Sequence, residues 1–186
     1  TVFACNGVYR TERPDYLVAV DPKMIFEIGE TDYPKNNQVW SNFNHQYNKK
    51  PTIMNHVKWF KPSLGWSSGP TALKMAADKG QFKTIYILGF DFQGHPRDHK
   101  SHRFSFNNLF KDTRNYKRSV DESTYYGNWM NQTKRVLRDY PHIEFRRVIH
   151  KTGFKPHDLE FTKNFKHVDL EKFYEIYNLH IEKSQK

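Results

Sequence analysis

The stretch SSGPTALKMAADKGQFKTIYILGFDF, residues 67–92, decides the fold class. Apolar residues recur at helical spacing over 71–79, and Gly80 ends that pattern, which predicts a helix that stops at a glycine. A short, mostly apolar run follows at 84–88 and predicts a buried strand. A helix, a turn and a buried strand make half of a βαβ unit, which implies a parallel sheet. We therefore expect an α/β, Rossmann-like fold, with a mostly parallel sheet flanked by helices in a single domain.

The rest of the chain supplies further elements of this kind. Asp21 and Pro22 have the features of a helix cap followed by a proline in the first turn, and we expect a short helix that ends at Gly29. Strands are expected at 2–5, 16–20, 38–42, 53–60 and 143–149, further helices at 128–140 and 168–181, and loops at 44–51, 93–123 and 151–166. These patterns predict a nucleotide-binding core over 1–150, followed by a C-terminal loop and an amphipathic helix over 151–186.

The composition excludes several classes of protein. Aromatic residues make up 16% of the 186 positions, which excludes a wholly disordered chain. No apolar run approaches the roughly 20 residues that a membrane-spanning helix needs. The single cysteine, Cys5, excludes an internal disulfide framework and a cysteine-rich zinc site, and its place at the end of a buried strand predicts an inert thiol. One free thiol is compatible with a reducing compartment, so a cytoplasmic location is expected.

The positive charge is concentrated in one loop. The chain has 30 Lys and Arg against 20 Asp and Glu, a formal net charge of +10. Between residues 95 and 118 there are seven Lys and Arg against two Asp, a local net charge of +5 that is half of the total. Arg97, Lys100 and Arg103 are the first three of these cations. Such a loop suits a phosphate-bearing ligand. Its interleaved aromatic residues also suit single-stranded nucleic acid, and the alternative is an ordinary soluble surface.

Polar residues follow the expected strands, where α/β proteins bind ligands. Asn6 can contact a hydroxyl or a base edge, or merely form a turn. Asp91 can accept sugar hydroxyls, bind a metal, act as a base, or cap the next loop. Ser67, Ser68 and Gly69 open a helix, whose free backbone amides suit a phosphate, unless the serines form an ordinary cap.

Three histidines of the basic loop, His95, His99 and His102, have a spacing that resembles a metal site. Pro96 and the surrounding cations oppose metal binding, and no cysteine accompanies the histidines. We therefore expect neither a metal nor a cofactor.

Several short motifs, taken in order, resemble a known family. The chain has CN-x-x-Y over 5–9, SSG over 67–69, GFDF over 89–92 and DESTYYGNW over 121–129. This order resembles that of the bacterial sialyltransferases of the Campylobacter type and of their uncharacterised glycosyltransferase-like relatives. The resemblance implies a Rossmann-like glycosyltransferase that needs no metal. It also implies that a CMP-type nucleotide is contacted by Asn6, Ser67, Ser68 and Gly69, with Asp91 beside the sugar or the ribose.

Two features depart from that family pattern. The catalytic histidine of the family aligns with Asn128, and an amide cannot act as a general base at neutral pH. The family also has a first strand ending in a phosphate-binding turn, so we expect such a strand ahead of 1–5. The catalytic candidates are Asp91, Asn128 and the nearby Tyr126. The leading hypothesis is a nucleotide-sugar-binding, glycosyltransferase-like domain; the alternatives are a nucleic-acid-binding accessory protein and a catalytically inactive homologue.

Overall fold

The first third of the chain forms a four-stranded parallel sheet. The computed structural model describes residues 1–93, 95–96 and 104–184. The strands are β1 (Phe3–Cys5), β2 (Tyr16–Val18), β3 (Val39–Ser41) and β4 (Val57–Trp59), and they neighbour one another in that order. The connections hold η1 (Asn6–Arg10), α1 (Pro22–Gly29), α2 (Tyr33–Asn36), η2 (His45–Lys49) and α3 (Pro51–His56). Apolar residues such as Leu17, Val39 and Ile25 are fully buried between this sheet and its helices.

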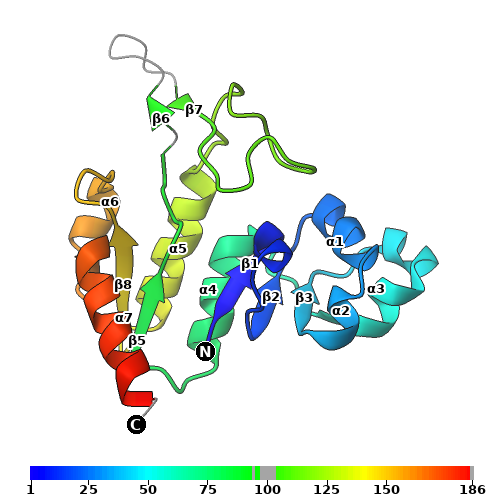
Figure 1. Cartoon of the computed structure of the whole chain (residues 1–186), viewed down its shortest axis with the longest axis horizontal. Helices are drawn as coiled ribbons and strands as arrows, with labels where there is room; N and C mark the ends of the chain where they lie inside the picture. Colours follow the sequence, from blue (N-terminus) through cyan, green and yellow to red (C-terminus); the bar gives the residue numbers. More distant parts are fainter. Residues whose placement is uncertain (94, 97–103, 185–186) are drawn as a thin grey trace.

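A second parallel sheet has the order β5-β8-β9. Its strands are β5 (Thr84–Ile87), β8 (Glu144–Ile149) and β9 (Phe165–Asp169), and its helices are α5 (Gly127–Asp139), α6 (His157–Glu160) and α7 (Leu170–Ser184). Alternate residues of a strand face opposite sides. Phe145 therefore packs in the core that includes Leu137 of α5, whereas Tyr86 contacts Phe173 of α7 on the other face. Helices thus cover both faces of this sheet (Figure 1).

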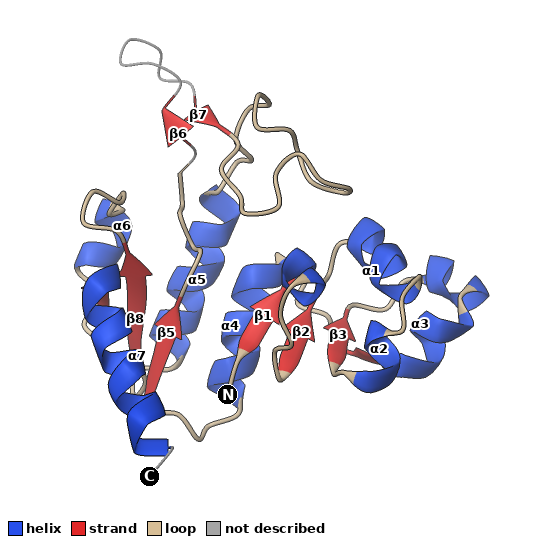
Figure 2. Ribbon diagram, in the orientation of Figure 1, coloured by secondary structure: helices blue, strands red, loops and turns tan. Residues whose placement is uncertain are grey.

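Helix α4 (Ser68–Asp78) links the two sheets. It follows β4, packs against β1 and β2, and leads into β5. The strands of both sheets point toward the same end of the molecule (Figure 1). The α/β, Rossmann-like prediction is confirmed, since both larger sheets are parallel throughout and are flanked by helices (Figure 2). A two-stranded antiparallel pair, β6 (His95–Pro96) and β7 (Phe104–Ser105), lies beyond the end of β5.

Four local predictions were wrong. The loop expected at 93–123 contains the short paired strands β6 and β7. The strand expected at 53–60 begins as helix α3, because Pro51 occupies its first turn with a fitting φ, and only Val57–Trp59 is extended. The loop expected at 44–51 contains η2, whose first turn is capped by the Asn44 side chain. The loop expected at 151–166 contains α6 and the start of β9. Strand β9 was not predicted because its sequence, FKHVD, is largely polar. With β9, the second sheet extends beyond residue 150.

The basic loop at 93–123 crosses to the first sheet. We call residues 105–123 of this loop the strap. Gly7 donates its backbone N–H to the Tyr116 hydroxyl at 2.8 Å, and Arg10 donates to the backbone carbonyl of Arg114 at 2.7 Å. Asn115 of the strap donates to the carboxylate of Glu27 in α1 at 2.7 Å. These contacts anchor the strap at the carboxyl end of β1, as Figure 1 shows in outline. The loop residues Arg97, Lys100 and Arg103 lie outside the described residues.

Candidate functional site

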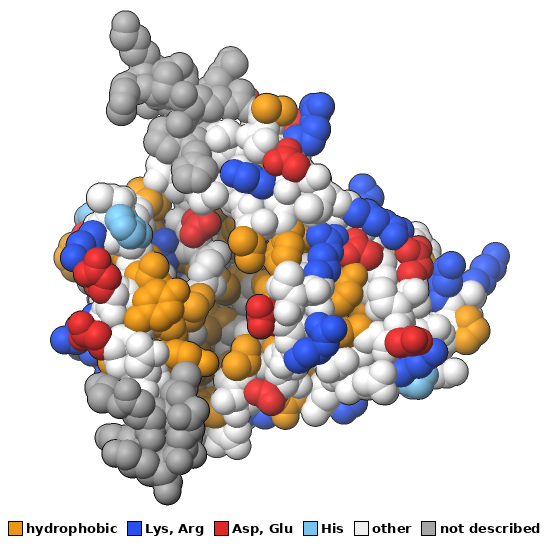
Figure 3. Space-filling view, viewed as in Figure 1, with side chains coloured by type: hydrophobic (Ala, Val, Ile, Leu, Met, Phe, Trp, Pro, Cys, Tyr) orange, Lys and Arg blue, Asp and Glu red, His pale blue; other side chains and the backbone are white. Residues whose placement is uncertain are grey.

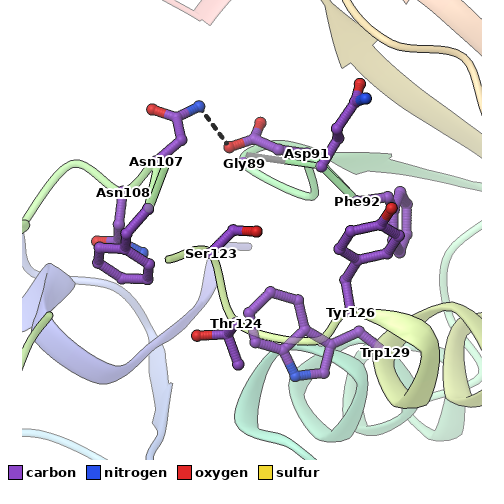
Figure 4. Close-up of a pocket in the computed structure, with 11 residues that line it drawn as sticks. Gly89, Asp91, Phe92, Asn107, Asn108, Ser123, Thr124, Tyr126 and Trp129 are labelled. Carbon is purple, nitrogen blue, oxygen red and sulfur yellow. Dashed lines mark hydrogen bonds between the residues drawn. The ribbon is translucent and has the colours of Figure 1, made fainter. Parts of the chain in front are cut away.

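A pocket opens where β5 ends and α5 begins, under the strap (Figure 4). Its walls combine one carboxylate, amide and hydroxyl side chains and aromatic rings. The lining residues are Gly89, Asp91, Phe92, Gln93, Phe106, Asn107, Asn108, Ser123, Thr124, Tyr126 and Trp129. The predicted catalytic candidates Asp91 and Tyr126 are thus brought together, although they are 35 positions apart in the sequence. The third candidate, Asn128, is exposed on the first turn of α5 and is not among the lining residues.

A sharp turn after β5 presents Asp91 to this pocket. Gly89 has a φ of +75°, in the left-handed region where a glycine meets no steric penalty. Phe92 also has a positive φ, of 55°, and its ring is 2% exposed, so burial of the ring offsets the strain of this backbone. Asn107 of the strap donates to Asp91 Oδ2 at 3.2 Å. The carboxylate is thereby placed between the sheet and the strap.

The turn rests on Arg147, which the sequence analysis did not identify. Arg147 is 3% exposed, and its guanidinium donates to the backbone carbonyls of Phe90 (2.6 Å), Asp91 (3.1 Å) and Phe154 (2.8 Å). It also lies over the Phe92 ring, 5.2 Å from the centroid. Burial lowers the pKa of Arg147 to about 10, so the side chain stays cationic at neutral pH. In the strand predicted at 143–149, Arg147 shares the face of the apolar residues Ile143 and Phe145, and this position could have indicated a buried arginine.

Aromatic side chains form one wall of the pocket. Tyr126 is the capping residue at the start of α5, and Trp129 follows on its first turn with 36% of its surface exposed. Tyr125 stacks on Tyr126 with ring centroids 6.4 Å apart and is itself 76% exposed. Exposed flat rings next to hydroxyl and amide groups suit a ligand with a ring and several polar substituents.

The predicted nucleotide-binding residues lie at the same edge of the sheets but outside the lining of this pocket. Asn6 follows β1 with a φ of 52°, and its buried Oδ1 has no hydrogen-bond partner among the described residues. Ser68 is 5% exposed and accepts a hydrogen bond from the backbone N–H of Val20 at 3.0 Å, which ties α4 to the end of β2. The N–H of Ser67 donates to the Gln132 side chain at 3.1 Å.

Gly69 connects this edge to the pocket. A Cβ at Gly69 would come within 3.1 Å of the Phe90 ring, so the start of α4 packs directly against the turn that carries Asp91. The amino end of α4 and the pocket are therefore neighbours.

Two of the strap's cations form ion pairs. Arg114 contacts Glu30 at 2.6 Å and Arg118 contacts Asp121 at 3.1 Å. No Lys or Arg is among the lining residues of the pocket within the described part of the chain. The strap's described cations therefore do not converge on the pocket.

The remaining candidates concern metal and thiol chemistry. The side chains of His95, His99 and His102 lie outside the described residues, and within those no group of three His, Cys, Asp or Glu side chains could hold a metal ion. Cys5 is half-buried, and burial raises the pKa of its thiol to about 11, so it is protonated at neutral pH.

Comparisons with models of known families, with characterised proteins and with solved structures found no match to this chain. Among the described residues, no helix has both the length and the apolar character needed to cross a membrane.

Proposed function

We propose that this chain is a nucleotide-sugar-binding, glycosyltransferase-like domain. In this proposal the uncharged part of the ligand, a sugar or a nucleoside, occupies the pocket beside Asp91. The phosphate lies toward the amino end of α4, beside Ser67, where Ser68 and Gly69 present backbone amides and the positive end of the helix dipole. The N–H of Ser67 itself donates to the Gln132 side chain. Because Gly69 packs against Phe90, the amino end of α4 and the pocket are adjacent, so a single ligand can occupy both.

The chemistry of the pocket wall carries the proposal. The Asp91 carboxylate can accept hydrogen bonds from the hydroxyls of a sugar ring, and the amides of Asn107 and Asn108 can both donate to them and accept from them. The exposed face of Trp129 is suited to stack on a sugar or a base. Since no cation lines the described pocket, an uncharged moiety fits it better than a phosphate does.

The same geometry bears on catalysis. Asp91 is the one titratable carboxylate among the lining residues and is the candidate base for an acceptor hydroxyl. The Tyr126 hydroxyl is the candidate donor to a leaving phosphate. Asn128 cannot take a proton at neutral pH, so the catalytic role does not fall on the position that the resemblance implied. If neither Asp91 nor Tyr126 acts, the chain is a binding module without transfer.

Titration of the protein with CMP, UMP and their sugar conjugates tests this proposal. A ligand at one hundred times its Kd stabilises the folded state by about 2.7 kcal/mol. For a chain of this length, that raises the Tm by roughly 5–10 °C. Asp91→Asn should weaken binding about tenfold or more, because hydrogen bonds to the charged carboxylate are lost. Absence of a Tm shift with every nucleotide and nucleotide-sugar would overturn the proposal.

A matched variant separates the pocket from general effects of charge. Asp139 lies at the far end of α5 and pairs on the surface with Arg135 and Arg138. Asp139→Asn removes the same charge and should leave the affinity unchanged. Release of the nucleotide from a bound sugar conjugate then distinguishes a transferase from an inactive homologue. Salt-sensitive binding of single-stranded RNA, without any effect of nucleotide-sugars, would instead favour the nucleic-acid-binding alternative.

A further inference from the structure

The two larger sheets face each other with unpaired edges. Among the described strands, β1 pairs only with β2, and β5 pairs only with β8. Both edge strands contact α4 and run in the same direction, side by side in Figure 1. The surface between them is hollowed and lined with apolar side chains in Figure 3. We call this hollow the inter-sheet groove.

The width of the inter-sheet groove is limited by a contact across one end. The ring of Phe3, in β1, meets the ring of Phe82, two residues before β5, edge to face with centroids 6.1 Å apart. At this end, one side chain from each edge is enough to bridge the gap between β1 and β5. Paired strands are about 4.8 Å apart, so edges separated by one further strand lie roughly 9.6 Å apart. Here the two edges are bridged by a pair of side chains and not by backbone hydrogen bonds, which leaves room for a strand between them.

Both edges direct backbone groups into the inter-sheet groove. The N–H and C=O of one residue in a parallel strand point to the same neighbour, and the direction alternates along the strand. Tyr16 N–H donates to the Val2 carbonyl at 3.1 Å, so the groups of the alternate residues Phe3 and Cys5 point away from β2. In β5, Glu144 N–H donates to the Lys83 carbonyl at 2.9 Å. By the same alternation, the backbone groups of the groove-facing residues of β5, Thr84 and Tyr86, point away from β8.

Apolar side chains flank these polar groups. Val2 is 58% exposed at the start of β1, and Leu88 is 54% exposed at the end of β5. Sheet edges of this kind, with free backbone groups and exposed apolar side chains, attract a further strand. The two edges are parallel, so a single strand that runs in the same direction satisfies both at once.

We propose that the inter-sheet groove holds one further parallel strand, supplied by a segment of the same polypeptide beyond these 186 residues. This strand joins the two sheets into one, in the order β4-β3-β2-β1, the inserted strand, β5-β8-β9. It pairs with three residues of β1 and four of β5 and is an apolar run, as central strands of parallel sheets are. The central position argues for the same polypeptide, because only covalent attachment gives such a strand a permanently high effective concentration.

Hydrogen exchange followed by NMR on the product of the complete reading frame tests this proposal. The amides of Phe3, Cys5, Thr84 and Tyr86 should exchange slowly, by a factor on the order of 100 or more relative to an unstructured peptide. Ala4 and Ile85 are the internal controls, since alternation directs their amides to β2 and β8. Cross-strand nuclear Overhauser effects should link both edges to the same extended segment.

Each other outcome overturns the proposal. Rapid exchange at the four groove-facing amides, with Ala4 and Ile85 protected, would show that the inter-sheet groove is empty. Protection that is lost on dilution, or contacts to a differently labelled copy, would show that the strand comes from another molecule. A reading frame without a strand-forming segment beyond these residues would also refute it. The measurement needs no nucleotide, so its result is independent of the proposed function.

Discussion

At the level of single residues, Arg147 supports the turn that forms one side of the pocket. It is buried and fixes three backbone carbonyls, two of them in the turn that carries Asp91. Arg147→Met should destabilise the protein by about 2–4 kcal/mol, because buried carbonyls lose their donors. It should also weaken nucleotide binding in step with Asp91→Asn. Urea unfolding measures the first effect; Arg138→Met, at a side chain that is 73% exposed, should change stability by less than about 0.5 kcal/mol.

The histidine beside Arg147 gives the protein a pH dependence of known sign. Burial, and then the charges of Arg147 and Lys155, lower the pKa of His167 to about 4, and its ring nitrogens have no partner among the described residues. Below the unfolded-state pKa of about 6.5, the unfolded chain binds a proton that the folded chain does not. Stability is therefore full above pH 6.5 and falls as the pH drops toward 4.

Replacing His167 should flatten this dependence. His167→Gln should lose less stability than the parent between pH 7 and pH 5, by on the order of 1–2 kcal/mol. Urea unfolding at the two pH values measures it. The same substitution at the exposed His142 is the matched control. Equal slopes in parent and His167→Gln would contradict the assignment.

At the scale of the element, the strap is held by a buried carboxylate. Glu27 is 6% exposed and accepts hydrogen bonds from Tyr9, Arg10 and Asn115. Burial opposes its charge, but these hydrogen bonds outweigh burial and hold the pKa of Glu27 below its usual value. The strap therefore ties the carboxyl end of the first sheet to the pocket that opens at the second.

Removing that charge should free the strap. Glu27→Gln leaves the Arg10 guanidinium without its carboxylate and should cost about 3 kcal/mol of stability. Limited proteolysis should then cut within 105–123 before it cuts the sheets. Glu30→Gln is the matched control: Glu30 pairs with Arg114 across an exposed contact, and its loss should have little effect. Similar cleavage of both variants would show that Glu27 does not hold the strap.

Elements were predictable from the sequence where local patterns and core burial agreed. Helix α4 and strand β5 follow from apolar spacing between Ser68 and Ile87, and the position of Asp91 follows from them. Strand β9 was missed because an edge strand with Lys166 and His167 lacks apolar alternation. The partners of Asp91 were also missed: Asn107 and Arg147 reach it through tertiary packing, which no local pattern encodes.

At the scale of the whole molecule, two apolar cores meet at one helix. One core lies between the first sheet and α1–α3, and the other between the second sheet and α5. Helix α4 contributes to both sides: Ala72 and Met75 pack beneath Val18 of the first sheet, whereas Leu73 and Ala77 belong to the second core. Within the described residues, α4 is thus the main apolar joint between the two halves, and the inserted strand proposed above would be another.

Shortening an apolar side chain of α4 at the junction of the two halves should reduce the cooperativity of unfolding. Met75→Ala removes an 8% exposed side chain at the junction, and Met130→Ala removes a 7% exposed one inside the second core. Each should cost about 2–4 kcal/mol, as buried methionines do. Only Met75→Ala should also lower the urea m-value and separate the transitions seen by circular dichroism and by fluorescence, measured with Trp66 and Trp129 replaced by Phe so that only Trp40 and Trp59 of the first sheet emit. Coincident transitions in both variants would mean that the halves are joined chiefly by contacts other than α4, of which the strap, held to the first sheet through Tyr116 and Asn115, is one.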